Sequence, residues 1–306
     1  MAESAPALPP RRTWWSRLWH NSAASTGGLF ILAAILLSLV GPAVYAGLLP
    51  PEQQPLRDGI YQDYNAINDG PSALHWFGAD YLGRDVLTRL LTAIRVSLTV
   101  ALVVETINIG VGGVLGIIAG YFGGAADMLI SRLADMLFAF PGLLLAILVS
   151  AVFGETARNL YGSVGRLLLV SSALSLVSWP LMARFMRGQA LALKSRDFVV
   201  ATESLGASDG WIIVRHVVPN LAWLIIVAAT LDVASVIVNE ATLSLLGLGI
   251  EEPGASLGLM IFKAASRLEH YPLQLFFPAA TITLLVLAFS FLGDGLRDVL
   301  EGGSYR

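Results

Sequence analysis

The sequence has no cysteine and few charged residues. The missing cysteines exclude a disulfide framework and a thiolate metal site. Only 13% of the 306 residues are charged and 56% are hydrophobic, whereas an ordinary soluble domain carries roughly 25% charged residues. The composition therefore indicates an integral membrane protein. The net charge of −3 gives no general attraction for nucleic acid, so we expect no nucleic-acid partner.

Two signatures of catalysis are also missing. The chain has no glycine-rich phosphate loop of the form G-x-x-x-x-G-K-[ST], so any ATP that it depends on must be hydrolysed by another chain. Its four histidines include no pair at the spacing with which a helix holds zinc. We therefore expect no catalytic residue, no metal site and no bound cofactor in this chain.

Six stretches are apolar over the roughly 20 residues that a helix needs to cross a bilayer. They lie at 26–49, 96–120, 136–154, 166–184, 221–244 and 273–292. The first could instead be a signal peptide, because Arg11, Arg12 and Arg17 precede it and Val44-Tyr45-Ala46 resembles a cleavage site. Its apolar run is about twice as long as that of a normal signal peptide, which favours a retained span.

The lysines and arginines between the spans predict that both ends of the chain are cytoplasmic. With the N-terminus inside, eleven of them lie on the inner side and eight on the outer side. Residues 84–95 place Arg84, Arg89 and Arg95 mostly opposite an apolar helical face, so we expect a helix that lies in the outer membrane–water interface. The predicted regions are a cytoplasmic N-terminal tail (1–25), a first span with an outer loop and the interfacial helix (26–95), and a core (96–306).

Residues 194–220, which we call the knob, lie between the fourth and fifth predicted spans on the cytoplasmic side. Apolar residues recur there at near-helical spacing until Gly206 interrupts them, and Ser208 and Asp209 offer oxygens that can cap a second short helix. Pro219 is expected to end that helix before the fifth span. Two short helices held between two spans can transmit a partner's movement, which a floppy loop cannot.

The knob resembles the cytoplasmic signature loop of ABC-importer permeases, whose pattern is E-A-A, three residues, G, nine residues and I-x-L-P. Aligned on Gly206 and Pro219, the chain has Val200 in place of the glutamate. Peptide and nickel importers resemble it better, with a form like D-F-V-x-A-A-x-x-L-G followed by R-H-x-x-P-N. The resemblance implies ATPase-coupling roles for Asp197, Ala201, Thr202, Leu205, Gly206, Ala207, Ser208, Arg215, His216 and Pro219.

Three of these residues have an alternative interpretation. Asp197 and Arg215 pair with the ATPase if the resemblance holds, but a solvated surface explains their charge equally well. For His216, which stands where the knob meets a span, packing or helix capping is the simpler expectation.

Four further stretches resemble the same family in the same order, at 75–98, 121–147, 240–249 and 292–301. Together with the knob they are similar to the C-type permease of dipeptide, oligopeptide, glutathione and nickel importers. The chain departs from that pattern at 251–258, where Leu257 stands at a position that is often aromatic in the family. This outer edge can touch the binding protein.

The resemblance implies an all-α integral membrane protein with the type I ABC-importer permease (MetI-like) architecture: six transmembrane helices, an outer interfacial helix and cytoplasmic coupling helices. It implies that the chain lies in the bacterial cytoplasmic membrane. It also implies four kinds of partner: a B-type permease, two cytoplasmic ATPase subunits that bind ATP and magnesium, an extracytoplasmic solute-binding protein, and lipid. The implied function is import of di- or oligopeptides by alternating access. Nickel, glutathione or another small solute is the alternative cargo.

Polar residues inside the predicted spans are the other candidate site. Asp232, Asn239 and Glu240 lie in the fifth span and Glu105 lies in the second. Charge is costly in hydrocarbon, so we expect these side chains to face protein or a water-filled path. Structural hydrogen bonding and lining the translocation path explain Glu240 equally well. A rival class is an ion-coupled secondary transporter in which Asp232 and Glu240 bind the ion, but such proteins usually show paired broken helices in two halves.

Overall fold

The computed structural model describes residues 18–301. Most of the predicted N-terminal tail, with Arg11, Arg12 and Arg17, lies outside the described residues, as does Arg306. Within residues 18–301 the chain is helical apart from loops and one isolated bridge between Ala79 and Asp85, which confirms the all-α prediction.

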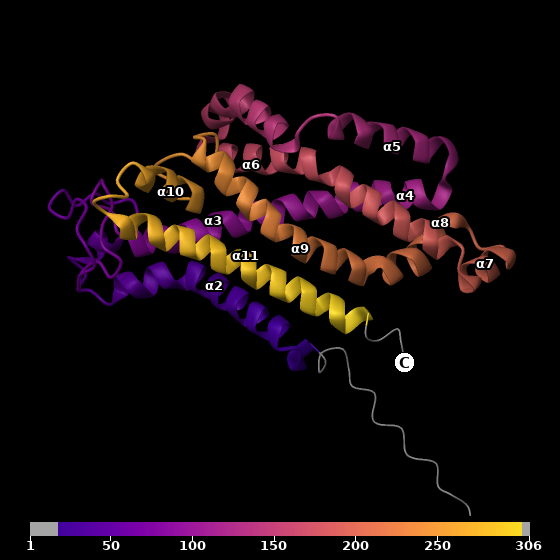
Figure 1. Ribbon diagram of the computed structural model, residues 1–306, viewed down its shortest axis with the longest axis horizontal. Helices are drawn as coiled ribbons and strands as arrows, with labels where there is room; N and C mark the ends of the chain where they lie inside the picture. Colours follow the sequence, from indigo (N-terminus) through magenta and orange to yellow (C-terminus); the bar gives the residue numbers. More distant parts are fainter. Residues whose placement is uncertain (1–17, 302–306) are drawn as a thin grey trace, which may run out of the picture.

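The helices form an elongated bundle whose long members run along the long axis of the molecule (Figure 1). Its elements are, in order, α2 (Ser22–Gly47), η1 (Gln54–Arg57), α3 (Val86–Ile107), η2 (Asn108–Gly113), α4 (Val114–Phe122), α5 (Gly124–Phe138), α6 (Gly142–Lys194), α7 (Asp197–Ser204), α8 (Asp209–Ile212), η3 (Ile213–Val217), α9 (Val218–Leu245), α10 (Leu257–Ala265) and α11 (Pro272–Glu301). In Figure 1, α7 and α8 lie at one end of the bundle, the knob end. The opposite end, the loop end, carries α10 and the loop 48–85.

Within residues 18–301, five helices are long and apolar enough to cross a membrane, at Ser22–Gly47, Val86–Phe122, Gly142–Lys194, Asp209–Leu245 and Pro272–Val299. The six predicted spans map onto them because two fall wholly or partly in α6. With 53 residues, α6 has a contour length of roughly 80 Å, more than twice the bilayer core of about 30 Å. Gly162 divides it, with φ 59° and ψ −137°, a conformation that residues with a β-carbon avoid. The predicted span 136–154 begins in α5 and passes a break at Pro141.

The first predicted span is part of the packed bundle, because α2 lies against α3 and α11. Asn21 caps α2 by accepting hydrogen bonds from the amides of Ala23 and Ala24, at 3.1 and 3.2 Å. Six residues after Asn21, Gly27 meets α11 so closely that a β-carbon there would overlap the carbonyl oxygen of Ala288.

Residues 84–95 do not form a separate interfacial helix; from Val86 they are the first turns of α3. Arg84 and Arg89 are buried in protein instead of reaching headgroups. One side of α3 packs against α2. There Arg95 donates to the carbonyl oxygen of Ser38 at 3.1 Å. Most of the polar face that the pattern assigns to lipid headgroups is covered by protein, while Arg95 stays exposed beside α2, and periodicity alone cannot distinguish these environments.

A row of glycines packs η2 and α4 against α6. Gly112, Gly116 and Gly120 are four residues apart, and a β-carbon on any of them would overlap a carbonyl oxygen of the α6 backbone. Small residues at this spacing let two membrane helices approach closely. The contact fixes α4, which ends at Phe122, relative to α6, which ends at Lys194 where the knob begins.

Candidate functional site

The knob is packed onto the bundle by buried apolar side chains. Val199 of α7, Ile212 of α8 and Val217 of η3 are fully buried and share a cluster with Met186 of α6. Gly206 turns the chain between α7 and α8 with φ 85°, so the predicted break between two short helices is confirmed. The knob is therefore a rigid extension of the bundle.

The surface of the knob exposes several large apolar side chains. Leu205 is 89% exposed to solvent, and Val214 is 71% exposed. Three more large apolar residues are exposed beside them: Phe198, Val200 and Trp211. Clustered exposed apolar side chains are typical of a protein–protein contact surface. In Figure 1 the knob also projects past the ends of α3, α9 and α11.

Tyr121 of α4 holds both sides of the knob, and it is a residue that the sequence reasoning missed. Its hydroxyl donates to the Asp209 carboxylate at 3.1 Å. Its carbonyl oxygen accepts a hydrogen bond from the ammonium of Lys194 at 2.7 Å, and the same ammonium lies 5.0 Å from the centre of its ring. The start of the knob and the start of α8 are thus fixed to one residue. No local pattern around Tyr121 marks this role, because it depends on the approach of α4 to α6.

Most residues with a predicted coupling role are accessible on the knob. Asp197, Ala201, Leu205, Gly206, Ser208, Arg215 and Pro219 are exposed, whereas Thr202, Ala207 and His216 are half-buried. The Thr202 hydroxyl donates back to the carbonyl of Phe198 at 2.6 Å within α7.

Two local expectations for the knob need correction. Ser208 occupies the cap position of α8 with extended backbone, but its side chain makes no capping hydrogen bond, and the Asp209 carboxylate is engaged by Tyr121. Pro219 does not end a helix: α8 continues through the π-helical turn η3 into α9. Pro219 lies in the first turn of α9, where a missing N–H is tolerated.

His216 packs as expected. Its ring lies 5.2 Å from the ring of Trp211 in a T-shaped arrangement and 6.0 Å from that of Phe198. Its carbonyl oxygen accepts a hydrogen bond from the Asn220 amide at 2.6 Å. His216 thus holds the two exposed aromatic residues against the base of the knob.

One face of α9 carries polar side chains at positions i, i+3 and i+7: Asp232, Ser235 and Asn239. Ser235 and Asn239 are exposed and Asp232 is half-buried. Asp232 and Ser235 line a cavity of about 560 Å³ between α6, α9 and α11, together with Gln189 and Arg297. The Asp232 carboxylate also accepts a hydrogen bond from Asn108 of η2 at 3.3 Å.

Glu240 lies inside the subunit and is fully buried. Its carboxylate accepts hydrogen bonds from Ser97 at 2.9 Å and from Ser244 at 2.8 Å. The hydroxyl of Ser256, which caps α10, lies 3.1 Å from that of Ser244. These bonds join α3, α9 and α10, so the contacts of Glu240 are those of structural hydrogen bonding.

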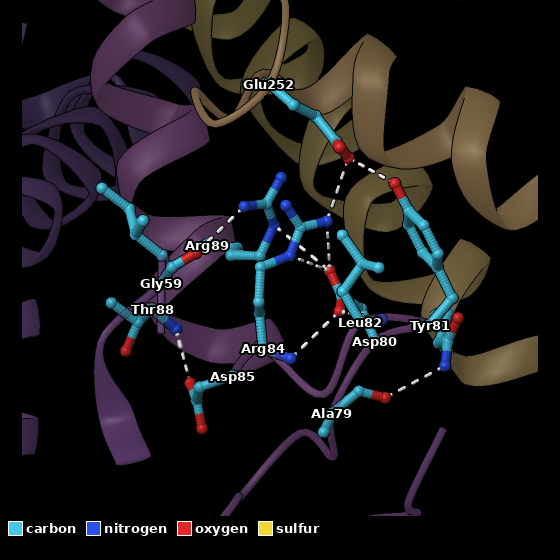
Figure 2. Close-up of polar contacts among 12 residues, drawn as sticks. Gly59, Ala79, Asp80, Tyr81, Leu82, Arg84, Asp85, Thr88, Arg89 and Glu252 are labelled. Atoms are coloured by element: carbon cyan, nitrogen blue, oxygen red, sulfur yellow. Dashed lines mark hydrogen bonds and ion pairs between the residues drawn. The ribbon is translucent and has the colours of Figure 1, made fainter. Parts of the chain in front are cut away.

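At the loop end, a network of charged side chains joins the loop 246–256 to the beginning of α3 (Figure 2). Glu252 accepts hydrogen bonds from Arg84, at 3.0 Å, and from the hydroxyl of Tyr81. Arg84 also donates to Asp80 at 2.8 Å, and Arg89 donates to the carbonyl of Gly59 at 2.9 Å (Figure 2). The network holds together three segments that are far apart in sequence.

The network shifts the pKa values of Glu252 and Tyr81. Burial raises the pKa of the Glu252 carboxyl, but hydrogen bonds from Tyr81 and Arg84 outweigh burial, and the pKa lies below its usual range. Burial and the hydrogen bond to Glu252 raise the pKa of the Tyr81 hydroxyl. Glu252 therefore carries its negative charge at neutral pH, opposite Arg84.

Comparison with known proteins places these features in a family. Residues 112–303 match the model of the binding-protein-dependent transport system inner membrane component. The chain is 38% identical to the glutathione transport system permease protein GsiD of Pectobacterium atrosepticum over 292 residues, which cover 95% of this chain and 91% of that protein. It is 39% identical over 292 residues to the proteins of the same name from Escherichia coli O6:K15:H31 and Shigella boydii serotype 4, covering 95% of this chain and 90% of each relative.

Proposed function

Because the chain belongs to the family of binding-protein-dependent transport system inner membrane components, we propose that it is the C-type permease of a peptide importer. The family assignment makes it a non-catalytic permease subunit of an ABC importer in the inner membrane. The observation that supports the coupling role best is the knob, a rigid pair of short helices with Leu205 and Val214 exposed. Such a surface suits a groove on a soluble ATPase.

The proposed assembly contains this chain, a B-type permease, two cytoplasmic ATPase subunits and a solute-binding protein. ATP and magnesium are held by the ATPases. When ATP draws the ATPases together, they move the knob, and the rigid contacts of Tyr121 with Lys194 and Asp209 carry that movement into α4, α6 and α9. The long helices then alternate between an outward-facing and an inward-facing arrangement.

We place the knob end in the cytoplasm and the loop end outside. Asn21 at the start of α2 donates to Asp298 near the end of α11 at 3.4 Å. The two ends of the described chain therefore lie on the same side of the membrane. The positive residues between the spans favour the cytoplasm for that side. The loop end, with the network around Glu252, then faces the solute-binding protein.

The translocation path is proposed to run along the face of α9 with Asp232 and Asn239. Both are polar and lie on one side of a helix that otherwise consists mainly of apolar residues. Polar groups in a span are tolerated where they face protein or a water-filled cavity. The cavity lined by Asp232 supports this position. Glu240, which is fully buried, contributes to the fold beside the path.

The cargo is proposed to be a di- or oligopeptide. Glutathione, itself a small peptide, is the second candidate because the relatives are named as glutathione transport permeases. The test is a calorimetric screen of the cognate solute-binding protein against dipeptides, tripeptides, glutathione and nickel, followed by ATP-driven uptake of the ligands in proteoliposomes. Binding and uptake of peptides support the proposal. Binding of nickel alone, with no uptake of any peptide, refutes it.

A further inference from the structure

Two carboxyl groups meet inside the bundle. Glu105 of α3 and Asp232 of α9 both accept hydrogen bonds from the same nitrogen, Nδ2 of Asn108, so their carboxyl groups lie side by side. Glu105 is buried, with 5% of its surface exposed. Two adjacent carboxylates repel each other, and the low-dielectric interior strengthens that repulsion. The pair therefore needs either a shared proton or a positively charged partner.

The neighbouring polar groups do not fully provide that partner. Asn108 donates to the Glu105 carboxylate at 3.4 Å and to the Asp232 carboxylate at 3.3 Å, so both N–H groups of its amide are used. Its carbonyl oxygen accepts from Ser178 at 2.8 Å. Among residues 18–301, the buried Oε2 atom of Glu105 has no hydrogen-bond partner. A buried acceptor without a donor is costly, and here it lies beside a second carboxylate.

The pair is accessible from the cavity through Asp232. Asp232 lines the cavity of about 560 Å³ and Glu105 does not, so a group in the cavity meets Asp232 first. Asn108, which orients both carboxylates, begins the π-helical turn η2, a local widening that often marks functional sites in helices. Ser235 and Gln189 supply further polar groups along the same wall, and Arg297 adds a cation from α11.

The chemistry of the pair favours one kind of ligand. Within residues 18–301, no group of three or more His, Cys, Asp or Glu side chains is placed to hold a metal ion. A divalent cation such as calcium needs about six to eight oxygen ligands, more than this pair supplies. An ammonium group needs fewer contacts: it has three N–H donors and matches two carboxylate oxygens. Its charge also neutralises one of the two carboxylates.

We propose that Glu105 and Asp232 form a binding point for the protonated amine of the cargo in the translocation path. The proposal rests on the proposed function, and it narrows the cargo to peptides with a free amino group. The amine enters from the cavity, contacts Asp232 first and donates to the unpartnered oxygen of Glu105. Asn108 keeps the two carboxylates in position while the amine arrives and leaves.

The test uses the whole importer in proteoliposomes, with saturating binding protein loaded with one of two peptides, one with a free α-amine and the same peptide N-acetylated. The variants are Glu105→Gln and Asp232→Asn, and Glu155→Gln, an exposed carboxylate on α6, is the matched control. Removing one member of a buried, hydrogen-bonded charge pair weakens binding strongly. We therefore expect uptake of the free-amine peptide to fall about thirtyfold in both variants. Uptake of the acetylated peptide, normalised to the unsubstituted importer, should change less than about threefold.

Three outcomes separate the proposals. If the unsubstituted importer takes up neither peptide, the proposed peptide function fails. If it takes up the free-amine peptide and Glu105→Gln and Asp232→Asn do so equally well, only the amine-binding proposal fails, and the pair merely shares a proton. Equal loss of both peptides in the variants also overturns the amine-binding proposal, because it marks a structural effect.

A second measurement needs no variant and so does not depend on folding. The apolar carbodiimide DCCD labels carboxyl groups in membrane interiors, and mass spectrometry locates the label in the assembled importer. We expect label on Asp232 or Glu105 that the free-amine peptide, delivered by its binding protein, suppresses at least severalfold and that the acetylated peptide does not. Equal labelling in the presence of both peptides contradicts the proposal.

Discussion

The hydroxyl of Tyr121 donates a hydrogen bond to the Asp209 carboxylate, 3.1 Å away, and this bond ties α4 to the beginning of α8. Because Lys194 donates to the carbonyl oxygen of the same tyrosine, α4, the end of α6 and the beginning of α8 are joined at one residue. A force applied to the knob therefore reaches two membrane helices through one residue. This arrangement leads to the first prediction.

Removing the Tyr121 hydroxyl should weaken coupling more than it weakens the fold. A hydrogen bond to a charged group contributes about 1.5–3 kcal/mol, so Tyr121→Phe should lower the ratio of transported cargo to hydrolysed ATP by about ten- to a hundredfold. The ratio is measured in proteoliposomes from paired uptake and phosphate-release assays. Tyr161→Phe, at an exposed tyrosine on α6, is the control and should leave the ratio unchanged. An unchanged ratio in Tyr121→Phe would show that the bond plays no part in coupling.

A bulky residue at Gly206 should block the ATPase contact without unfolding the subunit. Nothing lies within 4 Å of a β-carbon built at Gly206, although its φ of 85° disfavours other residues. Gly206→Trp should therefore insert into the membrane but lose copurification with the ATPases, or leave their hydrolysis uncoupled from transport. Gly70→Trp, at an equally open glycine in the loop 48–85, should retain both. Normal transport by Gly206→Trp would count heavily against a coupling role for the knob.

The glycine row between α4 and α6 should be intolerant of even one methyl group. A β-carbon at Gly116 would overlap the carbonyl oxygen of Ala183 and lie 2.9 Å from the β-carbon of Met186. Gly116→Ala should lower the thermal midpoint of the purified subunit, since overpacking typically costs about 1–3 kcal/mol. At Gly188 on α6 the added methyl group meets nothing, so Gly188→Ala should be neutral or stabilising by about 0.5–1 kcal/mol. The same midpoint for both variants would mean that α4 and α6 are not in close contact.

Acid should loosen the loop end through Glu252. Its pKa lies below the usual value because the hydrogen bonds from Tyr81 and Arg84 outweigh burial. A carboxyl with a lowered folded-state pKa adds stability above its unfolded pKa, and the protein loses that stability as pH falls through the folded value. The thermal midpoint should therefore drop on acidification below about pH 4, and less steeply in Glu252→Gln. Glu155→Gln, at an exposed carboxylate, should follow the unsubstituted protein. Equal slopes for Glu252→Gln and the unsubstituted protein would remove Glu252 from the network.

The sequence predicts the helical class, the positions of the spans and the two short helices of the knob, because these depend on local apolar periodicity and on a glycine at position 206. It does not predict that residues 84–95 begin α3, since the loops that cover Arg84 and Arg89 come from distant parts of the chain. The π-helical turn that carries the chain past Pro219 also has no local signature.

The site divides in the same way. The exposed residues of the knob are recognisable as a pattern along the chain. Tyr121 is not, because its partners Lys194 and Asp209 are brought to it by the packing of α4 on α6. Likewise Glu105 and Asp232 are 127 positions apart in sequence numbering (232 − 105), and only the fold places their carboxyl groups together.

The central claim, that this chain moves cargo only as part of an ATP-driven assembly, is tested most directly by reconstitution. Proteoliposomes are prepared with the chain alone and with the chain plus a B-type permease, two ATPase subunits and the solute-binding protein. We predict cargo uptake only in the complete assembly and only with ATP. Uptake by the chain alone under an ion gradient, without ATP, would contradict the claim and favour a secondary transporter.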